Sequence, residues 1–190
     1  MILEDLLTAC RKDPALRGWS CAEAVLYPGL WALWSHRIAH LLHRWRVPLL
    51  PRALSQLTRL LTGIEIHPGA VIGRRCFIDH GMGVVIGETA VLGDDVMLYH
   101  GVTLGGTGWW HGRTTSRRHP LIGDRTVLGV GATVLGPVSV GHDTVIGAQS
   151  LVLHDVPAHS SVRASGDTTV HTPGRITRPS RFINEEKRQA

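Results

Sequence analysis

Cysteine, aromatic side chains and long apolar runs are all scarce in this chain of 190 residues. The 3 cysteines are odd in number and lack the spacing of a metal site, so we expect free thiols in a reducing cytoplasm. The apolar stretch 22–34 contains Pro28 and Gly29 and is too short to cross a bilayer. Acidic residues stand near the start, where a signal peptide would be basic. These features predict a cytoplasmic protein without a membrane partner.

The charge balance shows no strong excess of either sign. Subtracting 15 acidic from 20 basic residues gives a formal net charge of +5. Much of this excess lies in one loop, at Arg113, Arg117 and Arg118, and in the last sixteen or so residues. A solvated tail and a basic loop account for it, so we predict no nucleic-acid partner. The loop could instead attract an anionic cofactor, because local positive potential concentrates phosphates.

An aliphatic residue recurs at every sixth position through most of the chain, in two phases. The members are Ile66, Ile72, Ile78, Ile86, Leu92, Leu98, Leu104, Ile122, Leu128, Val134, Val140, Ile146 and Val152. A period of six fits neither a helix nor simple strand alternation, but it fits a hexapeptide β-helix made of short flat faces and corners. The 22 glycines suit such corners, and an aromatic content of 5% suits a narrow aliphatic core. Cys76 falls at a small inward position, where we expect structural filler.

The remaining segments have a different organisation. Residues 1–62 carry no hexads, and their apolar spacing predicts helices at about 2–11, 20–27, 29–45 and 50–61. We assign 63–176 to the β-helical domain and 177–190 to a polar tail. The helical segment can cap the first coil, and repeated flat sides favour a symmetric homo-oligomer.

The stretch 105–121 interrupts the hexads with glycine, tryptophan and basic residues that cannot fill an apolar core. Leu104 and Ile122 are three whole hexads apart, so the phase is preserved. We therefore predict a protruding loop that leaves the coil and returns one turn later. Long loops on rigid scaffolds are common sites of function.

His80 lies where the repeat changes phase, preceded by Asp79 and flanked by glycines. It is fifteen residues beyond Glu65, a spacing that can place both side chains on neighbouring rungs of an eighteen-residue coil. A carboxylate bonded to one imidazole nitrogen fixes the tautomer and raises the basicity of the other nitrogen. Such a pair could act as a general base. The alternative, on spacing alone, is a surface histidine at a corner.

Other polar residues allow further hypotheses. Arg118 beside His119 suits binding of a carboxylate, because arginine offers a forked donor pair, although a basic loop end without a role is the alternative. Glu88 adds an acid at another corner. His36 and His40 are one helical turn apart, but they lack the glutamate of a metalloprotease motif, and we expect a structural role. Four histidines have no evident partners and receive no role: His142, His154, His159 and His171.

Several segments together resemble serine O-acetyltransferase. They are 63–70, 78–90, 99–108 and 118–120 in the repeat region, and 13–15 and 29–40 in the helical region. The resemblance covers roughly residues 10 to 156 and is far more specific than the hexad period, which many acyltransferases share. It implies a mainly β fold, a left-handed parallel β-helix preceded by an α-helical segment. The assembly implied is a homotrimer, or a hexamer built from two trimers, with active sites between subunits.

The resemblance also implies transfer of acetyl from acetyl-CoA to the hydroxyl of L-serine, giving O-acetylserine for cysteine synthesis without a metal. His80 matches the general base and Glu65 its carboxylate partner. The residues that match those binding serine are Asp13, Asp79, Glu88, Arg118 and His119. The CoA groove is matched by Gly105, Gly106, Thr107, Gly108, Gly129, Gly131, Ala132 and Ala148, with Arg175 as a phosphate partner.

Three segments depart from the family pattern. The loop residues 109–116 make the protrusion about four residues longer than usual. The segment 162–176 replaces a shorter one that contributes to CoA binding. The family docks a terminal isoleucine into cysteine synthase, whereas this chain ends in Arg188, Gln189 and Ala190, so we do not expect that complex.

Three competing functions remain open from the sequence. The first is O-acetylation of another hydroxyl, such as that of homoserine, a sugar or an antibiotic. The second is a metal-dependent hydratase of the γ-carbonic anhydrase kind, but the spacings of His80, His100 and His119 do not match its zinc ligands. The third is a non-catalytic trimeric scaffold.

Overall fold

The computed structural model describes residues 2–16, 18–108 and 117–164. Within these residues, four helical elements precede the repeats: α1 (Ile2–Lys12), the 3₁₀ helix η1 (Gly18–Leu26), α2 (Pro28–Arg44) and α3 (Leu50–Thr62). Their bounds lie close to those predicted, except that the second element is a 3₁₀ helix. Among the described residues, no helix has the length and apolar character needed to span a membrane.

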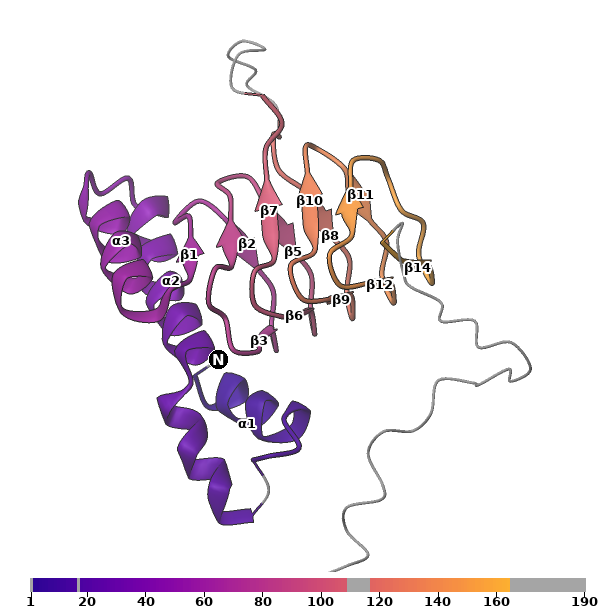
Figure 1. Ribbon diagram of the computed structural model, residues 1–190. Helices are drawn as coiled ribbons and strands as arrows, with labels where there is room; N and C mark the ends of the chain where they lie inside the picture. The colour runs from indigo at the N-terminus through magenta and orange to yellow at the C-terminus, as the bar shows by residue number, and fades with distance from the viewer. Residues whose placement is uncertain (1, 17, 109–116, 165–190) are drawn as a thin grey trace, which may run out of the picture.

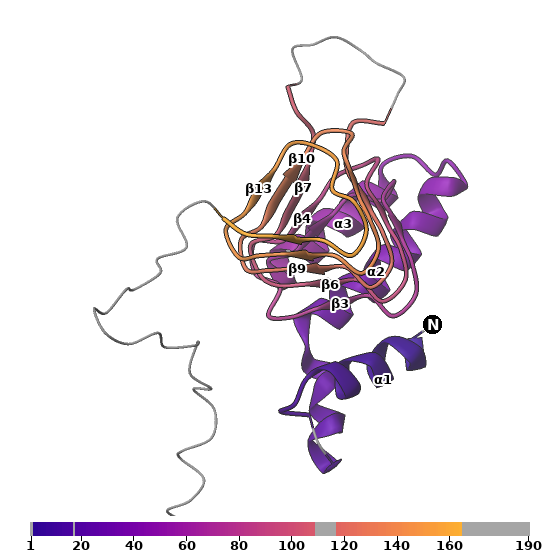
Figure 2. The ribbon, with the colours of Figure 1, turned by 90° about the vertical axis from the view of Figure 1, so that its right-hand side faces the viewer.

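Fourteen short strands follow in the described part of the chain, each of two or three residues. They are β1 (Glu65–Ile66), β2 (Val71–Ile72), β3 (Phe77–Ile78), β4 (Val85–Ile86), β5 (Val91–Leu92), β6 (Met97–Leu98), β7 (Thr103–Gly105), β8 (Leu121–Ile122), β9 (Val127–Leu128), β10 (Thr133–Leu135), β11 (Ser139–Val140), β12 (Val145–Ile146), β13 (Leu151–Val152) and β14 (Ser161–Val162). They form three parallel sheets, ordered β1-β4-β7-β10-β13, β11-β8-β5-β2 and β14-β12-β9-β6-β3. Viewed along the coil, the three sheets form the sides of a prism (Figure 2). The predicted parallel β-helix with an amino-terminal helical segment is confirmed.

The hexad residues fill the inside of this prism. All thirteen except Ile72 are buried, with exposed fractions of 5% or less. Burying one leucine or isoleucine side chain contributes about 1.5–3 kcal/mol. Because one such side chain recurs in each hexad, the buried residues form a continuous core along the coil. Small side chains occupy the inward corner positions. Cys76 is one of them, and burial raises the pKa of its thiol to about 12, which confirms the expected filler role.

Coil length varies along the prism, and the variation arises at three places. From β4 and from β8, the next turn takes eighteen residues, as the pairs Val85–Thr103 and Leu121–Ser139 indicate. The first turn takes twenty, since Glu65 pairs with Val85. The turn that contains the protruding loop takes thirty, since Val91 pairs with Leu121. The final turn takes sixteen residues, since Val145 pairs with Ser161.

The predicted return of the loop one turn later is wrong. The chain leaves the β1 sheet after β7 and re-enters at β8 in the adjacent β2 sheet, so it resumes on the next face of the same turn. The insertion adds twelve residues to an eighteen-residue turn. Twelve is two hexads, and for this reason the aliphatic phase survives. The residues 109–116 themselves lie outside the described part of the chain.

The helices cover the first coil of the prism (Figure 1). Gly29 in α2 packs against β3 so closely that a Cβ atom would lie 2.2 Å from the carbonyl oxygen of Ile78. In α3, the hydroxyl of Ser55 donates to the carbonyl of Ile66 at 2.7 Å. A buried ion pair between Arg37 and Asp5, 2.8 Å long, joins α2 to α1. These contacts tie the helices rigidly to the end of the coil where β1 begins.

A disulfide joins Cys10 in α1 to Cys21 in η1. The expectation of three free thiols is therefore wrong for this pair. The two cysteines are eleven positions apart, and their Cα atoms are brought within 5.3 Å by the turn between the two helices. Because that proximity depends on how α1 and η1 pack, the spacing alone did not indicate it.

Candidate active site

The turns between the three sheets stack into three corners along the coil. The His80 corner, which leads into the β1 sheet, comprises residues 79–84, 99–102, 129–132 and 147–150. The His119 corner, which leads out of the β1 sheet, comprises residues 67–70, 87–90, 106–108, 117–120 and 136–138. The Asp143 corner comprises residues 73–76, 93–96, 123–126, 141–144 and 157–160. The outer face of the β1 sheet therefore lies between the His80 corner and the His119 corner.

The backbone at His80 is unusual even for a corner. His80, Gly81 and Gly83 have φ values of 58°, 79° and 76°, in the left-handed region that glycine tolerates best. A Cβ on Gly81 would lie 2.4 Å from the Cδ1 atom of Ile64, so the chain passes close to the core here. The side chain of His80 is 73% exposed. Its ring therefore faces outward, where it can reach a substrate.

Two groups lie beside the His80 ring. The ring of His100, one coil further on, makes an edge-to-face contact with a centroid distance of 5.8 Å. The Oδ1 atom of Asp79 lies 3.8 Å from Nε2 of His80. Both neighbours are polar, so the imidazole is in a position from which it can exchange a proton.

Glu65 lies next to the His80 corner but has other partners. The amide of Glu65 donates to the carbonyl of Val84 at 2.9 Å, which fixes β1 against the end of the corner. The carboxylate of Glu65 forms ion pairs with Arg52 and Arg59 of α3, both at 3.2 Å. The direct contact with His80 that the spacing suggested is not formed among the described side chains of this single chain.

Asp13 lies in the turn after α1 and bonds to Tyr27, a residue that is affected by the charge of Asp79. The Oδ1 atom of Asp13 accepts the amide of Ala15 at 2.8 Å, and its Oδ2 atom accepts the hydroxyl of Tyr27 at 2.5 Å. The hydrogen bond to Asp13, together with burial and the nearby charge of Asp79, raises the pKa of Tyr27 to about 12. Tyr27 thus donates to Asp13 as a neutral hydroxyl. Sequence reasoning missed Tyr27, because no local pattern distinguishes it.

His119 is held in one tautomer by Thr89. The Thr89 amide donates to Nδ1 of His119 at 3.1 Å, and the Thr89 hydroxyl lies 2.8 Å from the same nitrogen. That hydroxyl also accepts the amides of Arg118 at 2.9 Å and His119 at 3.1 Å. A nitrogen that accepts an amide hydrogen carries no proton, so the ring bears its hydrogen on Nε2. Burial, followed by the charge of Arg118, lowers the pKa of His119 and favours this neutral donor.

The neighbours of His119 fit the ring tightly. A Cβ on Gly87 would lie 2.0 Å from Cδ2 of His119, so only glycine leaves room for the imidazole. Arg118 extends beside it and pairs with Glu88 at 3.2 Å, with both side chains about half exposed. An exposed pair of this kind is weak, so Arg118 can exchange Glu88 for the carboxylate of a ligand. This corner can therefore bind an anion.

Glycines line the His80 corner on successive coils. Gly83, Gly101 and Gly131 have φ values of 76°, 72° and 63°, and a Cβ on Gly101 would lie 3.3 Å from the Cα atom of Gly131. The buried Nδ1 atom of His100 has no hydrogen-bond partner among the described residues. A narrow surface of bare backbone with an unpaired polar atom suits an extended ligand such as the arm of CoA.

The predicted CoA residues fall at two corners. Gly129, Gly131, Ala132 and Ala148 belong to the His80 corner, where Ala132 is buried in the core and only its backbone can contact a ligand. The stretch Gly105–Gly108 starts the loop at the His119 corner. A Cβ on Gly106 would lie 3.6 Å from Nε2 of His119. Arg175 lies outside the described residues.

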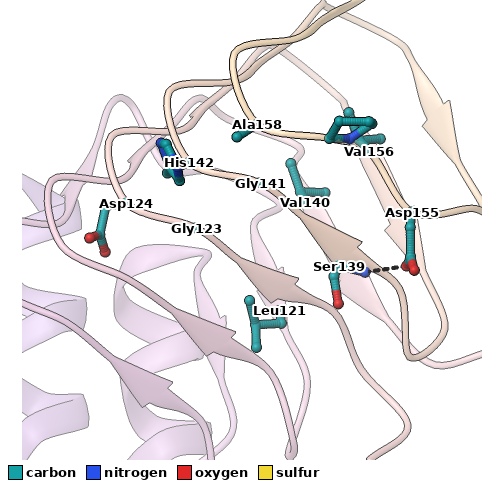
Figure 3. Close-up of a pocket in the computed structure, with 11 residues that line it drawn as sticks. Leu121, Gly123, Asp124, Ser139, Val140, Gly141, His142, Asp155, Val156 and Ala158 are labelled. Atoms are coloured by element: carbon teal, nitrogen blue, oxygen red, sulfur yellow. Dashed lines mark hydrogen bonds between the residues drawn. The ribbon is translucent and has the colours of Figure 1, made fainter.

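The structure thus brings the candidate residues together in two groups rather than one. His80 and Asp79 lie at one corner, whereas Arg118 and His119 lie at the other, with the β1 sheet between them. Asp13 bonds to Tyr27, whose hydroxyl is also affected by the charge of Asp79. A pocket of about 510 Å³ lies elsewhere, where β8 and β11 meet the last coil (Figure 3), and none of the candidate residues lines it. The candidate residues of a single chain therefore do not meet at one place.

Comparison with known proteins gives a consistent result. No family model matches the chain. Serine acetyltransferase of Helicobacter pylori is 55% identical over 161 residues, which is 84% of this chain and 91% of the relative. Serine acetyltransferase of Bacillus subtilis is 51% identical over 177 residues, which is 93% of this chain and 76% of the relative.

Solved structures agree with these relatives. The native serine acetyltransferase 1 of Entamoeba histolytica has a TM-score of 0.80 and 39% identity, covering 85% of this chain and 61% of that chain. Soybean serine acetyltransferase complexed with serine has a TM-score of 0.77 and 41% identity, covering 84% of this chain and 64% of that chain. This chain therefore spans a little over three fifths of the length of these solved chains.

Proposed function

The chain belongs to the serine acetyltransferase family, and we propose that it transfers the acetyl group of acetyl-CoA to the hydroxyl of L-serine. The product is O-acetyl-L-serine, an intermediate for cysteine biosynthesis. The observation that carries this proposal is 55% identity across 91% of the Helicobacter pylori enzyme. A related soybean structure contains serine, and a related Entamoeba histolytica structure contains L-cysteine.

His80 is the proposed general base. Its exposed ring takes the proton of the serine hydroxyl while the oxygen attacks the thioester carbonyl carbon. The resulting oxyanion is stabilised by backbone N–H groups, for which the glycine-rich stretch Gly105–Gly108 is the candidate. The carbon–sulfur bond then breaks, and His80 returns the proton to the departing sulfur, so that CoA leaves as a thiol. General-base catalysis of this kind contributes roughly 10²–10⁴-fold.

Glu65 is the proposed carboxylate partner of His80. Its place beside the His80 corner supports this role. Its ion pairs with Arg52 and Arg59 orient the carboxylate in the single chain, and one oxygen must turn toward the imidazole when the site is assembled. The transfer is direct, through a ternary complex, so initial-rate plots for the two substrates should intersect and not run parallel.

The charges at the two corners match the two ends of an amino acid. Asp13 and Asp79 provide negative charge for the ammonium group, while Arg118 and the neutral donor His119 suit the carboxylate, with Glu88 close by. Because these groups lie at different corners of one chain, we propose that the His80 corner of one protomer meets the His119 corner of the next. A cyclic homotrimer satisfies this requirement at three identical sites.

Exposed apolar side chains support association. Those on the coil include Val71, Val85, Leu121, Val145, Leu151 and Leu153, and those on the helices include Trp31, Ile38, Leu41, Trp45, Leu57 and Leu60. Such surfaces mark contact sites in soluble proteins. The coil residues would form the trimer, and the helical face would join two trimers in a hexamer. We also propose that the coil is left-handed, as in the family that the sequence resembles, and that the enzyme acts in the cytoplasm.

CoA binding is proposed along the glycine-lined His80 corner. Extended backbone without side chains, from Gly83 through Gly101 to Gly131, fits a narrow arm better than a bulky ring. The residues Gly129, Ala132 and Ala148 continue this surface through their backbone groups. No metal takes part in the proposed reaction.

An acceptor panel tests the proposal. Purified enzyme is given acetyl-CoA with serine, homoserine, threonine or a sugar, and released CoA is detected as free thiol. We expect serine to be used best, and faster turnover of homoserine would overturn the choice of acceptor. The variant His80→Ala should lower kcat/KM for serine by roughly 10²–10⁴-fold with an intact trimer. Activity that survives this change would reject His80 as the base, and no activity in the parent would favour a scaffold.

A further inference from the structure

The Asp143 corner, which the proposed reaction does not use, carries a ladder of alternating charges. Arg75, Asp95, Arg125, Asp143 and His159 all have φ values between 54° and 61° and occupy successive coils. Nη2 of Arg75 pairs with Asp95 at 2.8 Å, and Nη2 of Arg125 pairs with Asp143 at 2.7 Å. The series runs cation, anion, cation, anion, and it ends on a histidine. On the last coil, the imidazole of His159 therefore occupies the position at which the alternating series would next have a cation.

Two histidines, rather than one, meet at that last rung. The amide of His159 donates to the carbonyl of His142 at 3.0 Å, so the two residues stack on neighbouring coils. Their rings lie edge to face with a centroid distance of 4.8 Å. One ligand atom from each of His142, Asp143 and His159 can be chosen so that all three lie within 4.8 Å of one another. Sequence analysis assigned these two histidines no role, because seventeen positions separate them.

Asp143 has an arrangement that orients a metal-binding histidine. Its two oxygens accept Nε and Nη2 of Arg125, both at 2.7 Å, and Oδ2 also lies 2.7 Å from Nδ1 of His142. A carboxylate that accepts Nδ1–H leaves Nε2 with a lone pair for a metal. Histidines that bind metals commonly have such a partner.

We propose that His142 and His159 bind a divalent transition-metal ion such as zinc, with Asp143 orienting His142 and water completing the shell. Two neutral imidazoles suit zinc, copper or nickel better than magnesium or calcium, which prefer oxygen ligands. The site is open to solvent, since His142 is 50% exposed, and His142 also borders the pocket near the last coil (Figure 3).

The position of this site defines its effect on the fold. His142 precedes β12, and His159 precedes β14, the last described strand, at the end of the prism away from the helices (Figure 1). An ion bound to both residues links the last two coils. Terminal repeats of a solenoid have a neighbour on one side only and open first. The bound ion therefore stabilises the final coil against local unfolding, and this effect is independent of acetyl transfer.

The test uses the full chain without an affinity tag, stripped with a chelator and titrated with zinc chloride in a calorimeter. We expect one zinc site per chain. His142→Ala and His159→Asn should each weaken it at least tenfold; asparagine is chosen because it tolerates the positive φ of position 159. His154→Ala is the matched control, since His154 is an exposed histidine of the same last coil, and it should bind zinc as the parent does.

Hydrogen exchange supplies a second measurement. Zinc should slow exchange in residues 158–164 of the parent and of His154→Ala, but not in His159→Asn. Circular dichroism of each metal-free variant confirms that it is folded. The proposal is overturned if the parent binds no zinc, or if the double variant of positions 142 and 159 binds as much zinc as the parent. The latter result would assign binding to another histidine pair, such as His36 and His40.

Discussion

Replacing Thr89 by valine tests how the His119 corner is built. The Thr89 hydroxyl accepts the amides of Arg118 and His119 and lies 2.8 Å from Nδ1 of the His119 ring. Valine has nearly the same shape and removes only this hydroxyl. The backbone amide of Thr89 remains as a single donor to Nδ1, so the ring keeps its tautomer but loses part of its restraint.

The expected magnitude follows from these contacts. Arg118 is exposed, and water can replace the hydroxyl at its amide, whereas His119 is only 8% exposed and its amide loses its partner. One buried unsatisfied donor costs about 1–3 kcal/mol. In a protein of this size each kcal/mol lowers Tm by about 2–4 °C. A ring that is less well oriented should raise the KM for serine about tenfold, which corresponds to about 1.4 kcal/mol.

Thr126→Val provides the matched control. Thr126 is fully buried at the Asp143 corner, and its hydroxyl donates to the carbonyl of Gly141 at 3.0 Å. This variant should lose a comparable amount of stability and keep the parent KM for serine. Both variants are compared by thermal unfolding and by initial rates with serine and acetyl-CoA. A Thr89→Val enzyme with an unchanged KM for serine would refute the role assigned to His119.

Two further predictions concern the helical segment. Burial lowers the pKa of His36 to about 3, so between pH 6.5 and 3 the unfolded chain binds a proton that the folded chain does not. Stability should therefore fall as pH falls through this window, by at most about 1.4 kcal/mol per pH unit. In urea unfolding from pH 4 to 7, the free energy of unfolding of His36→Gln should depend less on pH than that of the parent. His43→Gln, which changes an exposed histidine, should match the parent. Identical pH dependence in all three proteins would contradict the assignment. The disulfide between Cys10 and Cys21 should stabilise the chain by about 3 kcal/mol, so reductant or the double serine variant should lower Tm. Alkylation followed by mass spectrometry measures its occupancy, and a double serine variant with the Tm of the oxidised parent would contradict this stabilisation.

The repeat architecture was predictable because its physical cause is local. Each hexad aliphatic must point into the prism, since six residues advance the chain by one face and one corner. Leu92, Leu128 and Ile146 occupy the positions that their phase predicts. The helices before the coil were also predictable, since their apolar spacing is helical and Pro28 begins α2.

Contacts across coils were not predictable, because they depend on coil length. The phase change near His80 makes the first coil twenty residues long, and the loop makes a later one thirty. Thr89 and His119 are thirty residues apart, which is the length of the coil that contains the loop. The preserved hexad phase did not reveal this contact, because it also allowed the loop to re-enter the coil one full turn later.

The sequence alone determined that this chain coils into a prism and that His80 lies at a corner, because periodic burial and chain direction are encoded residue by residue. Which side chains meet depends on how the coils and helices pack in the folded chain. This packing pairs Glu65 with Arg52 and Arg59, and it joins His142 to His159, by bringing distant residues together. These contacts depend on the total length of the chain between the two residues, and a short sequence motif does not predict them.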